Sequence, residues 1–149
     1  MKNISFLILI NLVSTSFIYA QGKTNDNQSP AIYSLIDQYS QAREKRDTVL
    51  LKSILTTDID QLVSSGEWRN GLKESTVGMM RSSAGSPGTR TLKIEKIRFI
   101  NMQCAIVDAR YEIQNADRSM RKMWSTFIVV DSKSGWKISA IRNMLPAAQ

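Results

Sequence analysis

The stretch AIVDARYEIQ, Ala105–Gln114, alternates apolar and polar side chains in a way that decides the class of fold. Successive side chains of a β-strand point to opposite faces, so the alternation predicts a strand with one dry face and one face in water. The residues expected on the dry face are Ala105, Val107, Ala109, Tyr111 and Ile113, and those expected on the wet face are Asp108, Arg110, Glu112 and Gln114.

Similar segments surround this strand on both sides. Short turn-forming stretches such as Asn115–Arg118 and Lys133–Gly135 separate the segments, and connections this short favour antiparallel neighbours. We therefore predict a curved antiparallel sheet. Its four strands are Thr91–Ile100, Gln103–Gln114, Arg121–Ser132 and Trp136–Leu145.

The segment Arg121–Ser132 is apolar on both of its faces. Trp124 and Ile128 share one parity, while Met123 and Phe127 share the other. A strand of this kind must be covered twice. We expect helices to cover one face, and we predict that a second copy of the chain covers the other, in a homodimer formed through the sheet.

Three helices are predicted before the strands. Ala31–Arg46 carries apolar residues at helical spacing, and Asp47 stands where Thr48–Leu55 would need an N-cap. Leu72–Ser83 has the same spacing, although Gly78 weakens it as a helix. The order of helices and strands predicts an α+β fold with three N-terminal helices packed on the sheet.

The N-terminus resembles a secretory signal. Lys2 precedes the apolar stretch Ile4–Val13, which is too short to span a bilayer. We predict cleavage after Ala20 and a secreted or periplasmic protein with no membrane attachment, and an uncleaved membrane anchor is the alternative. Residues 21–30 are poor in apolar side chains and are expected to be a disordered lead-in, whereas residues 31–149 have the length of one domain.

Composition narrows the classes of function. The chain contains no histidine and a single cysteine, and its formal net charge is +7. With no imidazole and one thiol, we predict no metal site and no cofactor, and an internal disulfide is impossible. The basic residues lack interleaved aromatic side chains, so nucleic acid is not an expected partner.

Arg142 is the charged residue of the mostly apolar last strand. A buried guanidinium needs a carboxylate or an anionic ligand. We predict that Arg142 lies in an internal cavity, where it either binds a ligand or pairs with Asp47 or Asp58. Asp47 is also a candidate proton acceptor, with a helix cap as the alternative. Asp58 is expected in a short edge strand, and it either faces the cavity or is a solvated turn residue.

Four aromatic side chains are candidates for the wall of a ligand cavity. Flat rings suit such walls, and tyrosine adds a polar group. Ordinary core packing is the alternative for each of them. The four are Tyr39, Trp68, Tyr111 and Trp124.

Several motifs together resemble the SnoaL-like branch of the nuclear transport factor 2-like superfamily, and in particular its secreted SgcJ/EcaC-like members of unknown function. The resemblance spans Ile32 to Pro146. It is carried by the pair Arg46-Asp47 before a short helix and by three further motifs, namely GEWRNG at 66–71, AIVDARY at 105–111 and GWKISAIRN at 135–143.

The resemblance implies a cone-shaped barrel that holds a small-molecule pocket between the helices and the concave sheet. Many relatives carry histidine at the position that matches Arg142, so the absence of histidine excludes a histidine-dependent dehydration. The leading hypothesis is a secreted domain that binds a small, partly apolar molecule. The alternatives are an isomerase or cyclase that uses Asp47 as acid or base, and a non-catalytic dimerisation or docking module.

Overall fold

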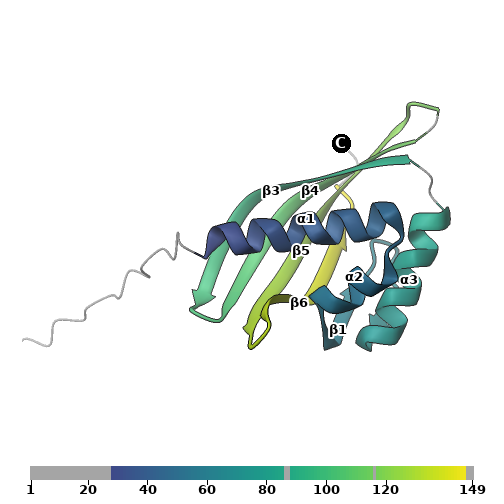
Figure 1. Cartoon of the computed structure of the whole chain (residues 1–149). Coiled ribbons are helices and arrows are strands. Elements are labelled where there is room, and N and C mark those ends of the chain that lie inside the picture. Colours follow the sequence, from purple (N-terminus) through teal and green to yellow (C-terminus); the bar gives the residue numbers. More distant parts are fainter. Residues whose placement is uncertain (1–27, 86–87, 116, 147–149) are drawn as a thin grey trace, which may run out of the picture.

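The computed structural model describes residues 28–85, 88–115 and 117–146, in which three helices pack on one face of a curved six-stranded sheet (Figure 1). The helices are α1 (Ser29–Lys45), α2 (Thr48–Ile54) and α3 (Gly71–Gly85). The strands are β1 (Leu55–Leu62), β2 (Trp68–Asn70), β3 (Gly88–Asn101), β4 (Cys104–Asn115), β5 (Met120–Ser132) and β6 (Gly135–Met144). The predicted α+β architecture is confirmed.

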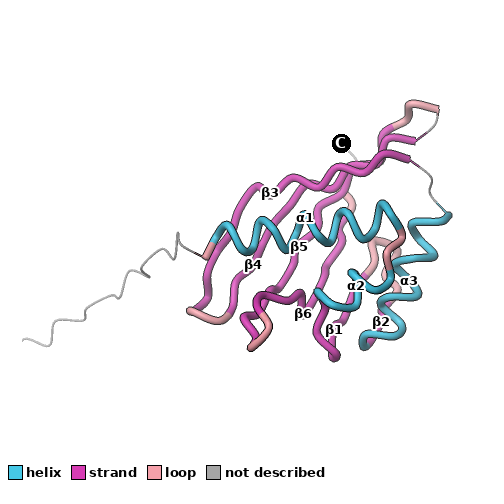
Figure 2. The backbone as a smooth tube through the Cα atoms, in the orientation of Figure 1, coloured by secondary structure: helices cyan, strands magenta, loops and turns pink. Residues whose placement is uncertain are grey.

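The strand order is β2-β1-β6-β5-β4-β3, which leaves the sheet open with β2 and β3 as its edges (Figure 2). The pairs from β3 to β6 are antiparallel, as their short turns predict. β1, however, runs parallel to β6, so the expectation of a purely antiparallel sheet is wrong at this pair. The chain between β1 and β6 passes through β2, α3 and the strands β3 to β5, and this long connection allows the parallel contact.

The start of the chain lies partly outside the described residues. The predicted signal peptide, 1–20, and most of the expected lead-in are in this part, and both stay predictions. The helix α1 begins at Ser29, two residues before the expected start, with Pro30 in its first turn. Proline suits this position because the first amides of a helix have no partner within the helix. Among the described helices, none has the length and hydropathy needed to cross a bilayer.

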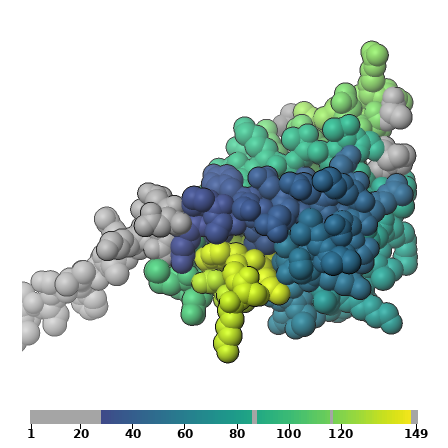
Figure 3. All heavy atoms as spheres, in the orientation of Figure 1, coloured from purple at the N-terminus to yellow at the C-terminus, as the bar shows by residue number. Residues whose placement is uncertain are grey.

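The main core lies between α1 and the concave face of the sheet. Figure 3 shows α1 lying across this side of the molecule with α2 beside it. The apolar stripe of α1 packs on the side chains of β4, β5 and β6 that point towards it, and the predicted dry face of β4 is confirmed. Fully buried members of this core include Ile32, Ile36, Val107, Phe127, Val129, Ile138 and Ile141.

The opposite side of the sheet, here called the outer face, carries none of the three helices that the described residues form. Its row across the strands runs Asp108, Thr126, Arg142, Leu62 and Trp68. Trp124 and Ile128 also lie on this face and are half-buried. The expected homodimer would use this surface, and it stays a prediction.

Candidate functional site

A small cavity lies between the helices and the concave face of the sheet, towards the end where β1, β2 and α3 meet. Its volume is about 60 Å³. We call it the inner cavity. Polar side chains dominate its lining, and no aspartate or glutamate is among the described residues that line it. The lining residues are Arg43, Gln61, Val63, Ser64, Arg69, Ser82, Arg90, Tyr111, Ile113, Arg121, Met123 and Asn143.

Arg43 comes to the cavity from the last turn of α1, and only 6% of it is exposed. Its Nε donates a hydrogen bond to Ser83 Oγ at 2.9 Å, and its Nη1 donates to Tyr39 Oη at 2.7 Å. Both partners are neutral. No carboxylate of the described residues forms an ion pair with this guanidinium. The structure therefore places a buried positive charge next to the cavity without a protein counter-ion.

Tyr39 positions this guanidinium from one turn earlier in α1. Its ring packs edge-on against Phe127, with 5.2 Å between the centroids. Burial raises the pKa of the Tyr39 phenol, although the charge of Arg43 opposes the shift. Tyr39 is therefore neutral near pH 7, and it accepts a hydrogen bond from Arg43 without cancelling its charge.

The raised pKa of Tyr39 predicts a loss of stability at alkaline pH. An unfolded tyrosine titrates near pH 10. Since the folded state keeps this proton to higher pH, the stabilisation is fully present below about pH 10 and is lost as the pH rises through the folded pKa. We expect urea unfolding between pH 9 and 11 to show a steeper decline for the wild type than for Tyr39→Phe. The exposed Tyr33→Phe is the control, and an equal slope in all three proteins would contradict the assignment.

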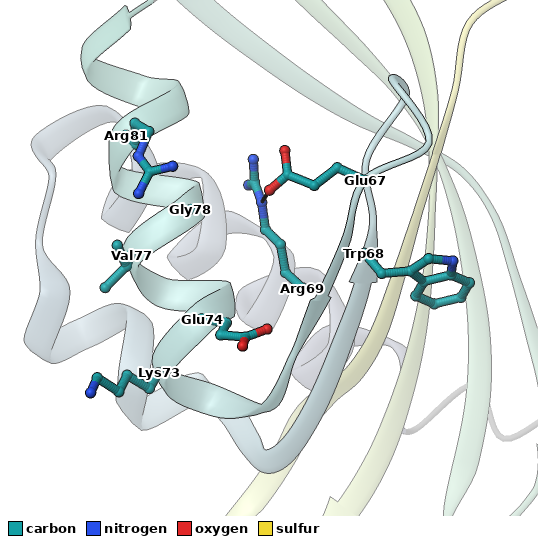
Figure 4. Close-up of a pocket in the computed structure, with 8 residues that line it drawn as sticks. All are labelled: Glu67, Trp68, Arg69, Lys73, Glu74, Val77, Gly78 and Arg81. Atoms are coloured by element: carbon teal, nitrogen blue, oxygen red, sulfur yellow. Dashed lines mark hydrogen bonds and ion pairs between the residues drawn. The ribbon is translucent and has the colours of Figure 1, made fainter.

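Arg69 comes from the edge strand β2 and points towards α3, as Figure 4 shows. It donates to Glu67 at 2.9 Å, to Gln61 Oε1 at 3.2 Å and to Ser82 Oγ at 3.3 Å. The α3 backbone can approach it because residue 78 is glycine. A Cβ at this position would overlap the Nε, Cδ and Cζ atoms of Arg69. Gly78 thus has a packing role that its low helix propensity conceals.

Tyr111 is the one predicted wall residue that lines the inner cavity. It comes from the dry face of β4 and is almost completely buried. Within the described part of the chain, its hydroxyl has no hydrogen-bond partner. The phenol is therefore available to a bound molecule.

Arg142 lies on the outer face, so the prediction that places it in the internal cavity is wrong. Its guanidinium donates to both carboxylate oxygens of Asp60, at 2.7 and 3.1 Å, and lies 4.8 Å from the ring centroid of Trp68. The ion pair that the sequence suggests does exist, but its partner is Asp60 and not Asp47 or Asp58. Because both sides of this arginine are engaged by protein, we do not assign it to a ligand.

The other predicted site residues lie apart from the inner cavity. Trp68 points away from Arg69 to the opposite side of β2, and Trp124 packs under Arg110 on the outer face at 5.2 Å. Asp58 is exposed, and β1 is an internal strand of the sheet, so the expected edge strand is wrong. Asp47 is exposed and accepts a hydrogen bond from the Leu50 amide at 2.9 Å, as a helix cap does.

Several solved structures have a fold similar to that of this chain. A domain of unknown function with a cystatin-like fold from Nostoc punctiforme matches with a TM-score of 0.73 and 17% identity, over 84% of this chain and 81% of that one. An NTF2-like protein of unknown function from Shewanella oneidensis matches with a TM-score of 0.67 and 18% identity, over 78% of this chain and 98% of that one. The chain has the nuclear transport factor 2-like fold. A ketosteroid isomerase-like protein from Erwinia carotovora matches with a TM-score of 0.69 and 14% identity, over 83% of this chain and 99% of that one.

No family model and no curated protein matches the sequence. The nuclear transport factor 2-like fold is therefore established by structure, while the narrower SnoaL-like branch stays a prediction. Relatives this distant share the fold alone, so any function has to be argued from the side chains of this chain. No group of three or more potential metal-ligand residues occurs in the described part of this nuclear transport factor 2-like domain.

The sequence did not single out Arg43 or Arg69. A signal for Arg43 was present, because it continues the buried stripe of Ile32, Ile36 and Tyr39 at helical spacing. A charged residue on such a stripe is unusual and marks a possible site. Arg69 had no comparable signal, since the three residues of β2 are too few to show a pattern.

Proposed function

We propose that this domain binds a small polar molecule, or the polar end of a larger one, in the inner cavity. The observation that supports this most strongly is the convergence of hydrogen-bonding side chains from α1, α3 and all six strands on one small space. Such groups come together at a cost in desolvation, which a polar ligand would offset. The Tyr111 hydroxyl and the Arg43 guanidinium are the two groups that a ligand would engage first.

Cavity size argues against a large apolar ligand. Pockets for drug-sized ligands have volumes of about 300–1,000 Å³, and a water molecule takes about 30 Å³ of liquid. At about 60 Å³, the inner cavity has room for one functional group. We therefore replace the expected partly apolar ligand by a polar one, whose remaining atoms would extend past Val63 and Ser64 towards solvent.

Binding is favoured over acid–base catalysis by the absence of a carboxylate from the described lining of the cavity. Asp47, the expected proton acceptor, bonds to the amide of its own helix and lies in solvent. An isomerase or cyclase would need a proton acceptor within hydrogen-bond reach of its substrate. The cavity supplies donors, which suit recognition of an electron-rich group.

We also propose that the domain acts outside the cytoplasm, because residues 1–20 have the pattern of a cleaved signal. N-terminal sequencing of the exported protein tests this, with Gln21 as the expected first residue. A mature protein that retains Lys2 would contradict it.

A fragment screen by NMR tests the site. The side-chain amide of Gln61 lies at the cavity, and the indole N–H groups of Trp68 and Trp124 report on the outer face. We expect fragments with small polar groups to shift the Gln61 signal. Binding that shifts only the two indole signals would contradict the proposal.

A pair of matched variants supplies the control for the screen. Val63 lines the inner cavity, whereas Val77 is 51% exposed on α3 and is not among the residues that line this cavity. A phenylalanine at Val63 would fill the cavity, whereas one at Val77 would lie on the surface of α3, outside the inner cavity. We expect Val63→Phe to abolish the Gln61 shift and Val77→Phe to preserve it. Equal binding by both variants would contradict the assignment of the cavity.

A further inference from the structure

Four guanidinium groups line the inner cavity, and they differ in whether a carboxylate or water balances their charge. Arg69 pairs with Glu67 at 2.9 Å, and Arg90 lies 3.7 Å from Glu44. Arg121 is exposed, so water solvates its charge. Arg43 is almost completely buried, and it has no carboxylate partner in the described chain.

A buried charge without a counter-ion is costly. Transfer of an ionised group out of water is offset only when hydrogen bonds and an opposite charge replace the lost solvation. Ser83 and Tyr39 give Arg43 hydrogen bonds but no negative charge. Burial would lower the pKa of Arg43, but the neighbouring phenols outweigh it and the pKa is raised, so the guanidinium keeps its proton.

The neutral groups beside Arg43 are also arranged as donors. The Gln61 side-chain oxygen is occupied by Arg69, which leaves its NH₂ group to donate. The hydroxyl of Tyr111 has no partner in the described chain, and Tyr39 uses its oxygen to accept from Arg43. A bound group would therefore meet the unpaired charge of Arg43 and several N–H and O–H donors, and no acidic side chain among the described lining residues.

The next inference rests on the proposed function. We propose that the ligand presents an oxyanion to the inner cavity, either a carboxylate or a sulfate- or phosphate-like group. Arg43 is the counter-ion of this oxyanion. Guanidinium groups bind such oxyanions through paired N–H donors. A volume of about 60 Å³ accommodates one group of this kind. The exposed Arg121, which donates to Ser64 at 3.0 Å, lies where the rest of a larger ligand would leave the cavity.

Titration with simple anions tests the inference and separates the possible sources. The full domain would be titrated with sodium acetate, sulfate or phosphate against sodium chloride at constant ionic strength, with the melting temperature and the NMR signals of Arg43 and Gln61 as readouts. We expect at least one of the three anions to raise the melting temperature and to shift both signals. A preference for acetate would indicate a carboxylate ligand, and a preference for sulfate or phosphate would indicate a tetrahedral one.

Arg43→Gln is the decisive variant, and Arg98→Gln is its matched control. Both remove one positive charge, but Arg98 is exposed on β3 and away from the cavity. A charge-assisted hydrogen bond is worth enough for its loss to weaken binding at least tenfold. We expect Arg43→Gln to weaken binding of the anion by at least this factor and Arg98→Gln to leave the binding unchanged.

The stability of the unliganded variant distinguishes this role from a structural one. If Arg43 is kept for an anion, Arg43→Gln removes an uncompensated charge and should melt at the same temperature as wild type or higher in chloride. A clear fall in melting temperature, with anion effects equal to those of wild type, would overturn the inference. Neutral fragments that shift Gln61 equally in wild type and Arg43→Gln would overturn the oxyanion and preserve the proposed function. A cavity that binds neither fragments nor anions would overturn both.

Discussion

We expect Phe127→Ala to lower the free energy of unfolding by about 3–5 kcal/mol, the usual cost of removing a fully buried aromatic ring. Phe127 is 0% exposed and lies at the centre of β5, between α1 and the inner face of the sheet. Its ring is also the edge-on partner of Tyr39. The substitution would leave a void beneath Tyr39, the tyrosine that positions Arg43. We therefore expect it to disturb the inner cavity as well as the core.

Phe99→Ala provides the comparison within the same sheet. Phe99 is only partly buried on the edge strand β3, where its ring meets Trp136 edge-on at 6.1 Å. We expect a smaller loss there, because less apolar area is removed from contact and the edge relaxes more easily. Urea unfolding measures both variants. Equal losses would contradict the central position of Phe127 in the core.

The fold was predictable where the chain follows a single period. The alternation of β4 identified its buried face residue by residue, because that strand has one apolar face and one polar face. The stripe of α1 was equally clear. These patterns record which side of each element meets the core, and no knowledge of distant residues is needed to read them.

Arg142 shows where such counting fails. Counting by twos from the buried Ile138 places Arg142 on the inner face. In the structure Val129 pairs with Ile138 and Ile128 with Ala140, so Ser139 is an extra residue on β6. This bulge reverses the parity of the rest of the strand, which buries Ile141 and turns Arg142 outwards. A segment that is apolar on both parities gives no sign of such a shift.

The inner cavity was out of reach for a different reason. Its polar groups come from segments far apart in the chain, and they meet only through the packing of α1, α3 and the sheet. Gln61 and Arg69 face the cavity because β1 pairs with both β2 and β6. Sequence reasoning placed β1 at an edge and did not include β2, so it could not bring these residues together.

Our last prediction is that Arg69 and Gly78 are strongly coupled. The effect of Gly78→Ala on stability should have opposite signs with and without the Arg69 side chain. In the wild-type background, Gly78→Ala forces the Arg69 side chain away from Gln61 and Ser82, because the new Cβ would overlap it. The loss of these hydrogen bonds should destabilise the protein by about 1–2 kcal/mol. In an Arg69→Ala background the space is empty, and the same substitution should stabilise α3 by about 1 kcal/mol, the helix-propensity difference between alanine and glycine.

The resulting coupling energy of about 2–3 kcal/mol is at the upper end of what residues in direct contact show. Urea unfolding of the four proteins in the cycle measures it. Gly85→Ala is the control within α3, because a Cβ there meets nothing within 4 Å and its effect should not depend on residue 69. If Gly78→Ala has the same effect in both backgrounds, Arg69 does not occupy the space over α3. The donors of the inner cavity would then be arranged differently, since Arg69 is the group that fixes the Gln61 oxygen and leaves the Gln61 amide to donate.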